Sequence, residues 1–118
     1  MTQPQLNALN LFCAEKVMGW HRTTGFLGES RFGITSDGEI LMRGTANTSP
    51  IWSPTTDPAQ AMLVFEKCAL KLDCNFRIEY WLSGKYHCLK SDEPNCMIIS
   101  AETLPLCIVK FAEKIFNK

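Results

Sequence analysis

The sequence predicts an α+β domain in which an antiparallel sheet lies between helices, in α/β/α layers with about three helices and four to five short strands. Apolar residues recur at helical spacing in three segments, near residues 5–18, 58–72 and 103–116. Short alternating or glycine-bounded segments between them are typical of strands. Because 118 residues have room for one domain, residues 1–118 are expected to form a single unit.

The first helix is expected over Gln5–Met18, where the apolar residues are Leu6, Leu9, Cys13 and Val17. Gly19 is expected to end this helix, since glycine readily takes the left-handed conformation of a C-terminal cap. Farther along, Asp37-Gly38 is typical of a tight turn and predicts a hairpin between Arg31–Thr35 and Ile40–Arg43.

The second helix is expected to begin at Asp57-Pro58 and to end near Leu72. The Asp57 carboxylate can accept hydrogen bonds from first-turn amides, and Pro58 stands where a missing N–H has no cost. The predicted core face consists of Ala61, Met62, Phe65, Cys68, Ala69 and Leu72.

Alternation of apolar and polar residues over Phe76–Leu82 predicts a half-buried strand. A short turn then leads to a second strand over Tyr86–Lys90, and Cys96–Ile99 is expected to form a third. Ser100 or Thr103 can cap the last helix, which is expected to run to about residue 116. Its predicted core face consists of Leu104, Ile108, Phe111, Ala112 and Ile115.

Composition narrows the classes of partner. Twelve Lys and Arg residues balance twelve Asp and Glu residues, whereas a protein that binds duplex nucleic acid needs a basic surplus. No apolar stretch approaches the roughly 20 residues that span a bilayer. The six cysteines follow no secretory signal and form no C-x-x-C pair, so reduced, mostly buried thiols in a cytoplasm are expected, with no metal or other cofactor.

No known catalytic motif is present, and the chain has only two histidines, His21 and His87. A binding protein is therefore expected rather than an enzyme. Trp20, Trp52 and Trp81 lie near the ends of elements, where an indole can stack on a nucleobase at about 1–3 kcal/mol. For Trp20 and Trp52 a structural role is favoured, and a sheet covered on both faces would bury Trp81.

The preferred binding region is the glycine-rich section that contains Arg22, Arg31 and Arg43. The planar guanidinium of arginine binds phosphate oxygens in bidentate fashion, and functional loops are often irregular. Thr48 and Ser49 can add hydroxyl donors. Together with the three tryptophans, these residues form the predicted ligand site.

Three strings spread over the chain, Ala14–Trp20, Trp52–Asp57 and Glu102–Ile108, resemble the phage ABA-sandwich family, small proteins encoded by phages and prophages. The resemblance spans most of the chain, although residues 22–50 depart from it. It implies a helix–sheet–helix sandwich and a phage protein in the cytoplasm of a bacterial host.

By analogy with other small phage accessory proteins, the resemblance favours an anti-defence sponge. Such a protein would sequester a cyclic nucleotide or cyclic ADP-ribose-type immune signal without cleaving it, within a homo-oligomer. The alternative is an interaction module that inhibits a host protein directly. A nucleotide-degrading enzyme that uses His21 or His87 is less favoured, and the fold does not choose among these functions.

Overall fold

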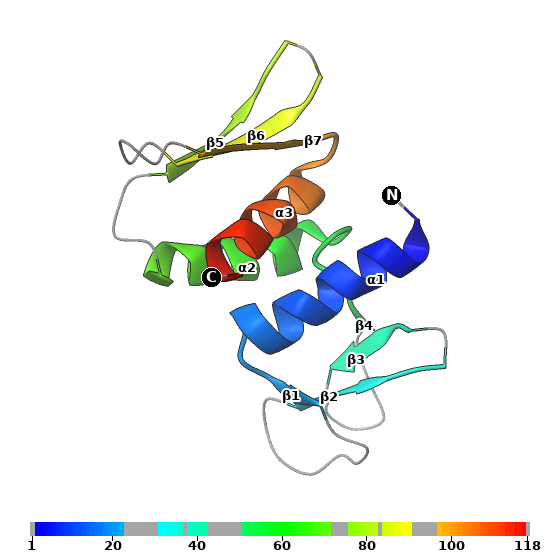
Figure 1. Cartoon of the computed structure of the whole chain (residues 1–118). Helices are drawn as coiled ribbons and strands as arrows, with labels where there is room; N and C mark the ends of the chain where they lie inside the picture. Colours follow the sequence, from blue (N-terminus) through cyan, green and yellow to red (C-terminus); the bar gives the residue numbers. More distant parts are fainter. Residues whose placement is uncertain are drawn as a thin grey trace.

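The computed structural model describes residues 2–22, 31–36, 38–42, 51–71, 76–82, 84–90 and 97–117. In these residues the chain forms three α-helices, a π-helical turn at Cys13–Val17 and seven strands (Figure 1). The helices are α1 (Gln3–Phe12), α2 (Pro58–Lys71) and α3 (Leu104–Phe116). The strands are β1 (His21–Arg22), β2 (Arg31–Ile34), β3 (Ile40–Met42), β4 (Ile51–Trp52), β5 (Phe76–Tyr80), β6 (Tyr86–Lys90) and β7 (Met97–Ala101).

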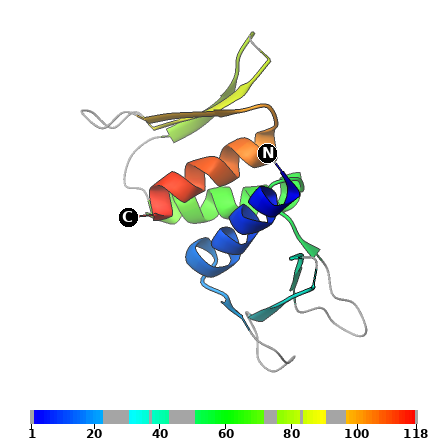
Figure 2. The same cartoon turned by 45° about the vertical axis from the view of Figure 1, so that its right-hand side comes forward.

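The strands form two separate sheets with the helices between them. One sheet has the order β1-β2-β3-β4, in which β1 is parallel to β2 and the other pairs are antiparallel. The other sheet has the order β5-β6-β7 and is antiparallel throughout. The β5-β6-β7 sheet packs on α3, and the β1–β4 sheet lies beyond α1 (Figures 1 and 2).

The α+β class and the three helices are confirmed, whereas the strands divide between two sheets instead of joining one. Each sheet is built from strands close in sequence, and α2 separates the two groups. Alternation along a strand predicts which of its faces is apolar, but it does not predict which strands are neighbours. The alternation of apolar and polar residues therefore could not predict the number of sheets.

Helix α1 begins at Gln3 rather than Gln5 because Thr2 caps it. The Thr2 hydroxyl accepts a hydrogen bond from the Gln5 amide, and the Gln5 side chain accepts one from the Thr2 amide. At the other end, Gly19 has a φ of 73°, as its role as a C-terminal cap predicts. The preceding residues form the π-helical turn, whose extra residue the apolar spacing did not indicate.

The two hairpins and the start of α2 agree with the sequence prediction. Gly38 and Gly84 both have a positive φ in the turns that join β2 to β3 and β5 to β6. Asp57 Oδ1 accepts hydrogen bonds from the amides of Ala59 and Gln60, which caps α2.

The predicted core face of α2 is partly wrong. Ala61 and Cys68 are fully buried, but Met62 and Ala69 are exposed. The buried stripe also includes Val64, which lies between the two correct positions on the helix surface. Aliphatic residues occupy both sides of α2, so composition alone could not centre the stripe. Leu72 lies outside the described residues.

Helix α3 is capped by Thr103, one of the two predicted residues, and it contributes more buried residues to the core than any other described element. Its buried residues are Pro105, Cys107, Ile108, Val109, Phe111, Ala112 and Ile115. Around them pack α1, the π-helical turn, α2 and single residues of both sheets, such as Phe32 and Cys88. No described helix is long and apolar enough to cross a membrane.

The four cysteines within the described residues are buried free thiols, as predicted: Cys13, Cys68, Cys88 and Cys107. Cys74 and Cys96 lie outside the described residues. Burial raises the pKa of Cys68 to about 12 and raises that of Cys13 further. A hydrogen bond between the Cys107 and Cys88 sulfurs, which lie 3.3 Å apart, raises the pKa of Cys88, and burial adds to that effect. These three thiols are therefore protonated at neutral pH and poor nucleophiles.

Replacing Ile108 by alanine should lower the free energy of unfolding by about 2–5 kcal/mol, because the truncation leaves a cavity in the packed core. Urea denaturation followed by circular dichroism would measure the loss. Lys114→Ala, at an exposed position of the same helix, is the control and should change stability little. Equal losses in both variants would contradict the assignment of α3 as the centre of the core.

Candidate functional site

The segment Trp52–Asp57 joins β4 to α2 and is held by hydrogen bonds within the segment. The amides of Thr56 and Asp57 donate to the Ser53 carbonyl at 3.0 and 2.8 Å. The Ser53 amide donates to Gln60 Oε1 at 2.6 Å, which ties the segment to the first turn of α2. Together these bonds fix the direction in which α2 leaves the sheet.

Asn10, a buried residue of α1, binds the same segment. Its Oδ1 accepts a hydrogen bond from the Thr55 amide at 3.1 Å, and its Nδ2 donates to the Ser53 hydroxyl at 3.4 Å. Its main-chain carbonyl accepts a hydrogen bond from Trp52 Nε1 at 3.1 Å. One asparagine therefore joins α1 to the connection between β4 and α2.

Two of the predicted tryptophans pack against each other. Trp52 is fully buried, and its ring centroid lies 4.7 Å from that of Trp20 in a T-shaped arrangement. Trp20 is half-buried and packs against the core. In this structure both indoles make intramolecular packing contacts.

The predicted arginines are only partly placed. Arg22 lies in β1 and Arg31 in β2, two strands that pair in parallel, so the structure brings these two positions onto neighbouring strands. Arg43, Thr48 and Ser49 lie outside the described residues. The phosphate-binding set of this section remains a prediction.

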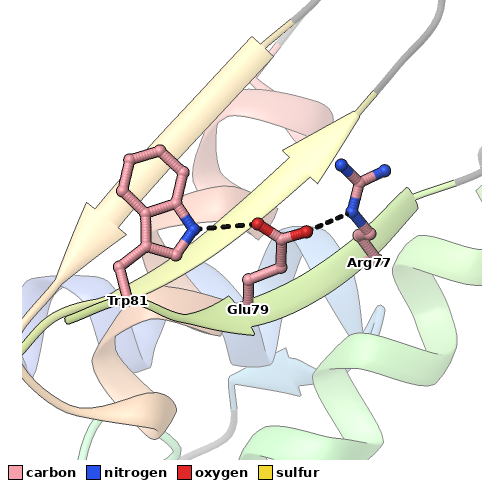
Figure 3. Close-up of polar contacts among 3 residues, drawn as sticks. All are labelled: Arg77, Glu79 and Trp81. Carbon is pink, nitrogen blue, oxygen red and sulfur yellow. Dashed lines mark hydrogen bonds and ion pairs between the residues drawn. The ribbon is translucent and has the colours of Figure 1, made fainter.

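Trp81 differs from the other tryptophans, because it is 41% exposed and its ring is held from one side. Its Nε1 donates to Glu79 Oε1 at 2.8 Å, and Arg77 Nε donates to Glu79 Oε2 at 2.6 Å (Figure 3). The hydrogen bonds from Arg77 and then from Trp81 lower the pKa of Glu79, so this carboxylate is ionised at neutral pH. Glu79 thus orients both an indole and a guanidinium.

His87 lies beneath the Trp81 ring. The two rings stack with centroids 3.7 Å apart and planes inclined by 26°, and His87 is 8% exposed. In the register of the sheet, His87 stands opposite Glu79 on β5 and opposite Ser100 on β7. Both ring nitrogens are buried, and neither has a hydrogen-bond partner within the described part of the chain.

These side chains share the face of the β5-β6-β7 sheet that points away from α3. The opposite face carries Cys88, whose sulfur contacts Cys107 of α3, and side chains of a strand alternate between faces. Beyond the Trp81 group, the outer face carries Ser100 and Ile98, which is 57% exposed. None of the described helices or strands covers it (Figures 1 and 2).

Of this group, only Trp81 was predicted from the sequence to bind a ligand. A sheet covered on both faces would have buried Trp81, and the open outer face is the reason that the indole is exposed instead. A signal for two further residues was present, since Arg77 and Glu79 occupy the same polar phase of the strand as Trp81. No sequence signal places His87 against Trp81.

The arrangement is suited to binding a flat, anionic molecule. Trp81 offers an oriented aromatic surface, and Arg77 bonds Glu79 through Nε, so both terminal Nη groups are without a partner among the described residues and can bind an oxyanion. The Arg77 side chain is also well exposed. In the described ranges, no group of three His, Cys, Asp or Glu side chains could hold a metal ion.

A shallow groove of about 350 Å³ lies between α1 and α3. It is lined by Gln5, Ala8, Leu9, Phe12, Lys110 and Glu113. Its single cation and single anion offset each other, and none of the predicted site residues lies there. The Trp81 group is therefore the stronger candidate site.

Comparisons with known proteins address the fold. The sequence matches the model of the phage ABA sandwich domain over residues 11–112. Among solved structures, the chain is similar to a crystal structure of a phage protein from Bacillus cereus ATCC 14579, with a TM-score of 0.58 and 19% identity, over 96% of this chain and 91% of that chain. None of the curated proteins compared with the chain matches it. At this identity the structural likeness shows a shared fold.

Asn10→Ala should lower the free energy of unfolding by about 1–3 kcal/mol, because it leaves the buried Thr55 amide without an acceptor. Chemical denaturation measures the change. Glu15→Ala, at an exposed position just after α1, is the control and should be close to wild type. A wild-type stability for Asn10→Ala would show that the joint between α1 and residues 52–57 contributes nothing.

Proposed function

The chain belongs to the phage ABA sandwich domain family, and we propose that it is an anti-defence binding protein of a phage. In this proposal it sequesters a cyclic nucleotide or cyclic ADP-ribose-type immune signal in the cytoplasm of the bacterial host. It holds the signal without cleaving it. The observation that carries the proposal is the exposed Trp81 indole, which Glu79 orients, beside the Arg77 guanidinium, which bonds Glu79 through Nε and not through its terminal nitrogens.

Stacking on Trp81 supplies the contact with the base. A base stacked on an aromatic side chain is worth about 1–3 kcal/mol in proteins that bind single strands. The hydrogen bond to Glu79 keeps the indole on the same face of the sheet as Arg77, so one ligand can contact both side chains. Arg77 supplies the contact with the phosphate, because its terminal nitrogens can bind phosphate oxygens in bidentate fashion.

One further property supports a protein that holds its ligand without cleaving it, and another supports a homo-oligomer. The buried thiols Cys13, Cys68 and Cys88 have raised pKa values and are protonated at neutral pH, so these three are not activated nucleophiles, whereas the hydrogen bond with Cys88 lowers the pKa of Cys107. A formal net charge of zero resists self-association only weakly. Two copies that meet through faces carrying Trp81 and Ile98 would enclose a ligand between them.

A thermal-shift screen tests the proposal with a panel of cyclic dinucleotides, cyclic trinucleotides and cyclic ADP-ribose isomers. A specific ligand at about 100 times its Kd should add about 2.7 kcal/mol of stability, which raises Tm clearly in a domain of this size. In Trp81→Ala the Kd of that ligand should rise by on the order of tenfold or more, measured by calorimetry.

Trp81→Phe is the matched control, because it keeps an aromatic surface and should retain part of the affinity. The ligand recovered after denaturation of the complex should be chemically unchanged. A panel without any shift would contradict the nucleotide sponge, and a cleaved ligand would contradict the holding function.

Inhibition of a host protein is a second candidate, and the outer surface of α2 favours it. Met62, Leu63 and Leu70 are exposed there, and Leu70 is 81% exposed. Leu63 and Leu70 are separated by two helical turns, so they share one face of the helix. Several large apolar side chains on one exposed face are typical of a protein-binding surface.

Capture experiments with host lysate distinguish this candidate from the first. If α2 binds a host protein, the wild-type chain should retain one stoichiometric partner, and the double variant Leu63→Asp, Leu70→Asp should lose it. Lys114→Ala on α3 is the control and should keep the partner. Equal capture by all three proteins would exclude this surface as the binding site.

A further inference from the structure

His87 has an unusual combination of burial and missing hydrogen bonds. It is 8% exposed, yet neither Nδ1 nor Nε2 has a partner in the described residues. Buried polar groups in folded proteins nearly always form hydrogen bonds, because each unmet one destabilises the fold. A neutral imidazole contains one donor and one acceptor, so His87 has hydrogen-bonding capacity that a ligand can use.

The neighbours of His87 show what kind of ligand would use it. Ser100 stands directly opposite on β7, on the same face, and its hydroxyl is exposed and free of hydrogen bonds to the described residues. Arg77 on β5 is the diagonal neighbour of His87, a distance that a long side chain can reach. The three residues therefore place an imidazole, a hydroxyl and a guanidinium around one spot of the sheet. These groups can all donate to a phosphate oxygen.

We propose that His87, Ser100 and Arg77 form a phosphate subsite, which the Trp81 ring covers as long as no ligand is bound. The identity of the ligand as a nucleotide rests on the proposed function, whereas the subsite itself rests on the unpartnered His87 and its neighbours. On binding, the indole moves off the imidazole and stacks on the base, while the phosphate takes the place that the indole has left. Trp81 thus stacks on the His87 imidazole before binding and on the base of the ligand after it.

The charge of Glu79 limits which phosphate fits. Its carboxylate is ionised and keeps Arg77 in place through Nε. Because the Glu79 carboxylate offsets the positive charge of Arg77, the pair offers no net positive charge, and an anion of high charge is disfavoured there. The subsite suits a phosphodiester with a single negative charge better than a terminal phosphate with two. Cyclic nucleotides carry their phosphates in this diester form.

Nuclear magnetic resonance of the imidazole nitrogens tests the subsite without a nucleotide. The chain contains only His21 and His87, so a sample labelled with ¹⁵N in histidine gives two sets of ring signals, and a His21→Gln variant assigns them. Titration with dimethyl phosphate, a phosphodiester without a base, should shift the His87 signals to saturation. Inorganic phosphate at the same ionic strength should shift them less, and sodium chloride should not shift them in a saturable way.

Three variants sharpen the test. Ser100→Ala, at an exposed position that should leave the fold intact, should weaken dimethyl phosphate binding by on the order of tenfold. Trp81→Ala should bind dimethyl phosphate as well as or better than wild type, because the cover over His87 is gone. Lys114→Ala, on α3, should bind as wild type does.

The outcomes separate the subsite from the proposed function. His87 signals that dimethyl phosphate leaves unchanged, or an unaltered affinity in Ser100→Ala, would overturn the subsite even if a nucleotide binds elsewhere. Saturable shifts with dimethyl phosphate would support it even if every cyclic nucleotide of the panel fails to bind. In that case the subsite stands and the sponge function does not.

Discussion

Asn10, a buried residue of α1, is the joint on which the arrangement of the helices depends. Its side-chain amide forms hydrogen bonds with Ser53 and Thr55, and its main-chain carbonyl accepts one from the Trp52 indole. These bonds join residues 42 to 45 positions apart in the sequence. The same short segment leads directly into the cap of α2. A buried amide without a partner destabilises the fold, so loss of the Asn10 side chain would leave the Thr55 amide unsatisfied. The joint thereby fixes α1, β4 and the start of α2 relative to one another.

Local features of the fold were predictable because their causes are local. Gly19 ends the first helix by its left-handed conformation, Asp57 and Thr103 cap the next two helices, and Gly38 makes the first hairpin turn. Each of these depends on a few neighbouring residues and on backbone sterics. Their agreement with the structure follows from that short range.

Long-range features were not predictable in the same way. The partition of the strands into two sheets depends on which strands become neighbours, and strand alternation does not contain that choice. The stack of Trp81 on His87 joins two strands across a turn, and the exposure of its indole depends on a sheet face that nothing described covers. The arginines at 22 and 31 were predicted as phosphate ligands because they lie in a glycine-rich section, and the structure adds that their strands are paired.

The separation of the two sheets by the helical layer has a consequence for how this protein can change over generations. The Asn10 joint lies on the side of α1 and β4, and the outer face of β5-β6-β7 lies on the far side of α3 (Figure 1). None of the described residues belongs to both regions. Substitutions on the outer face can therefore be accepted without disturbing the Asn10 joint. Adaptability and stability reside in different parts of this small chain.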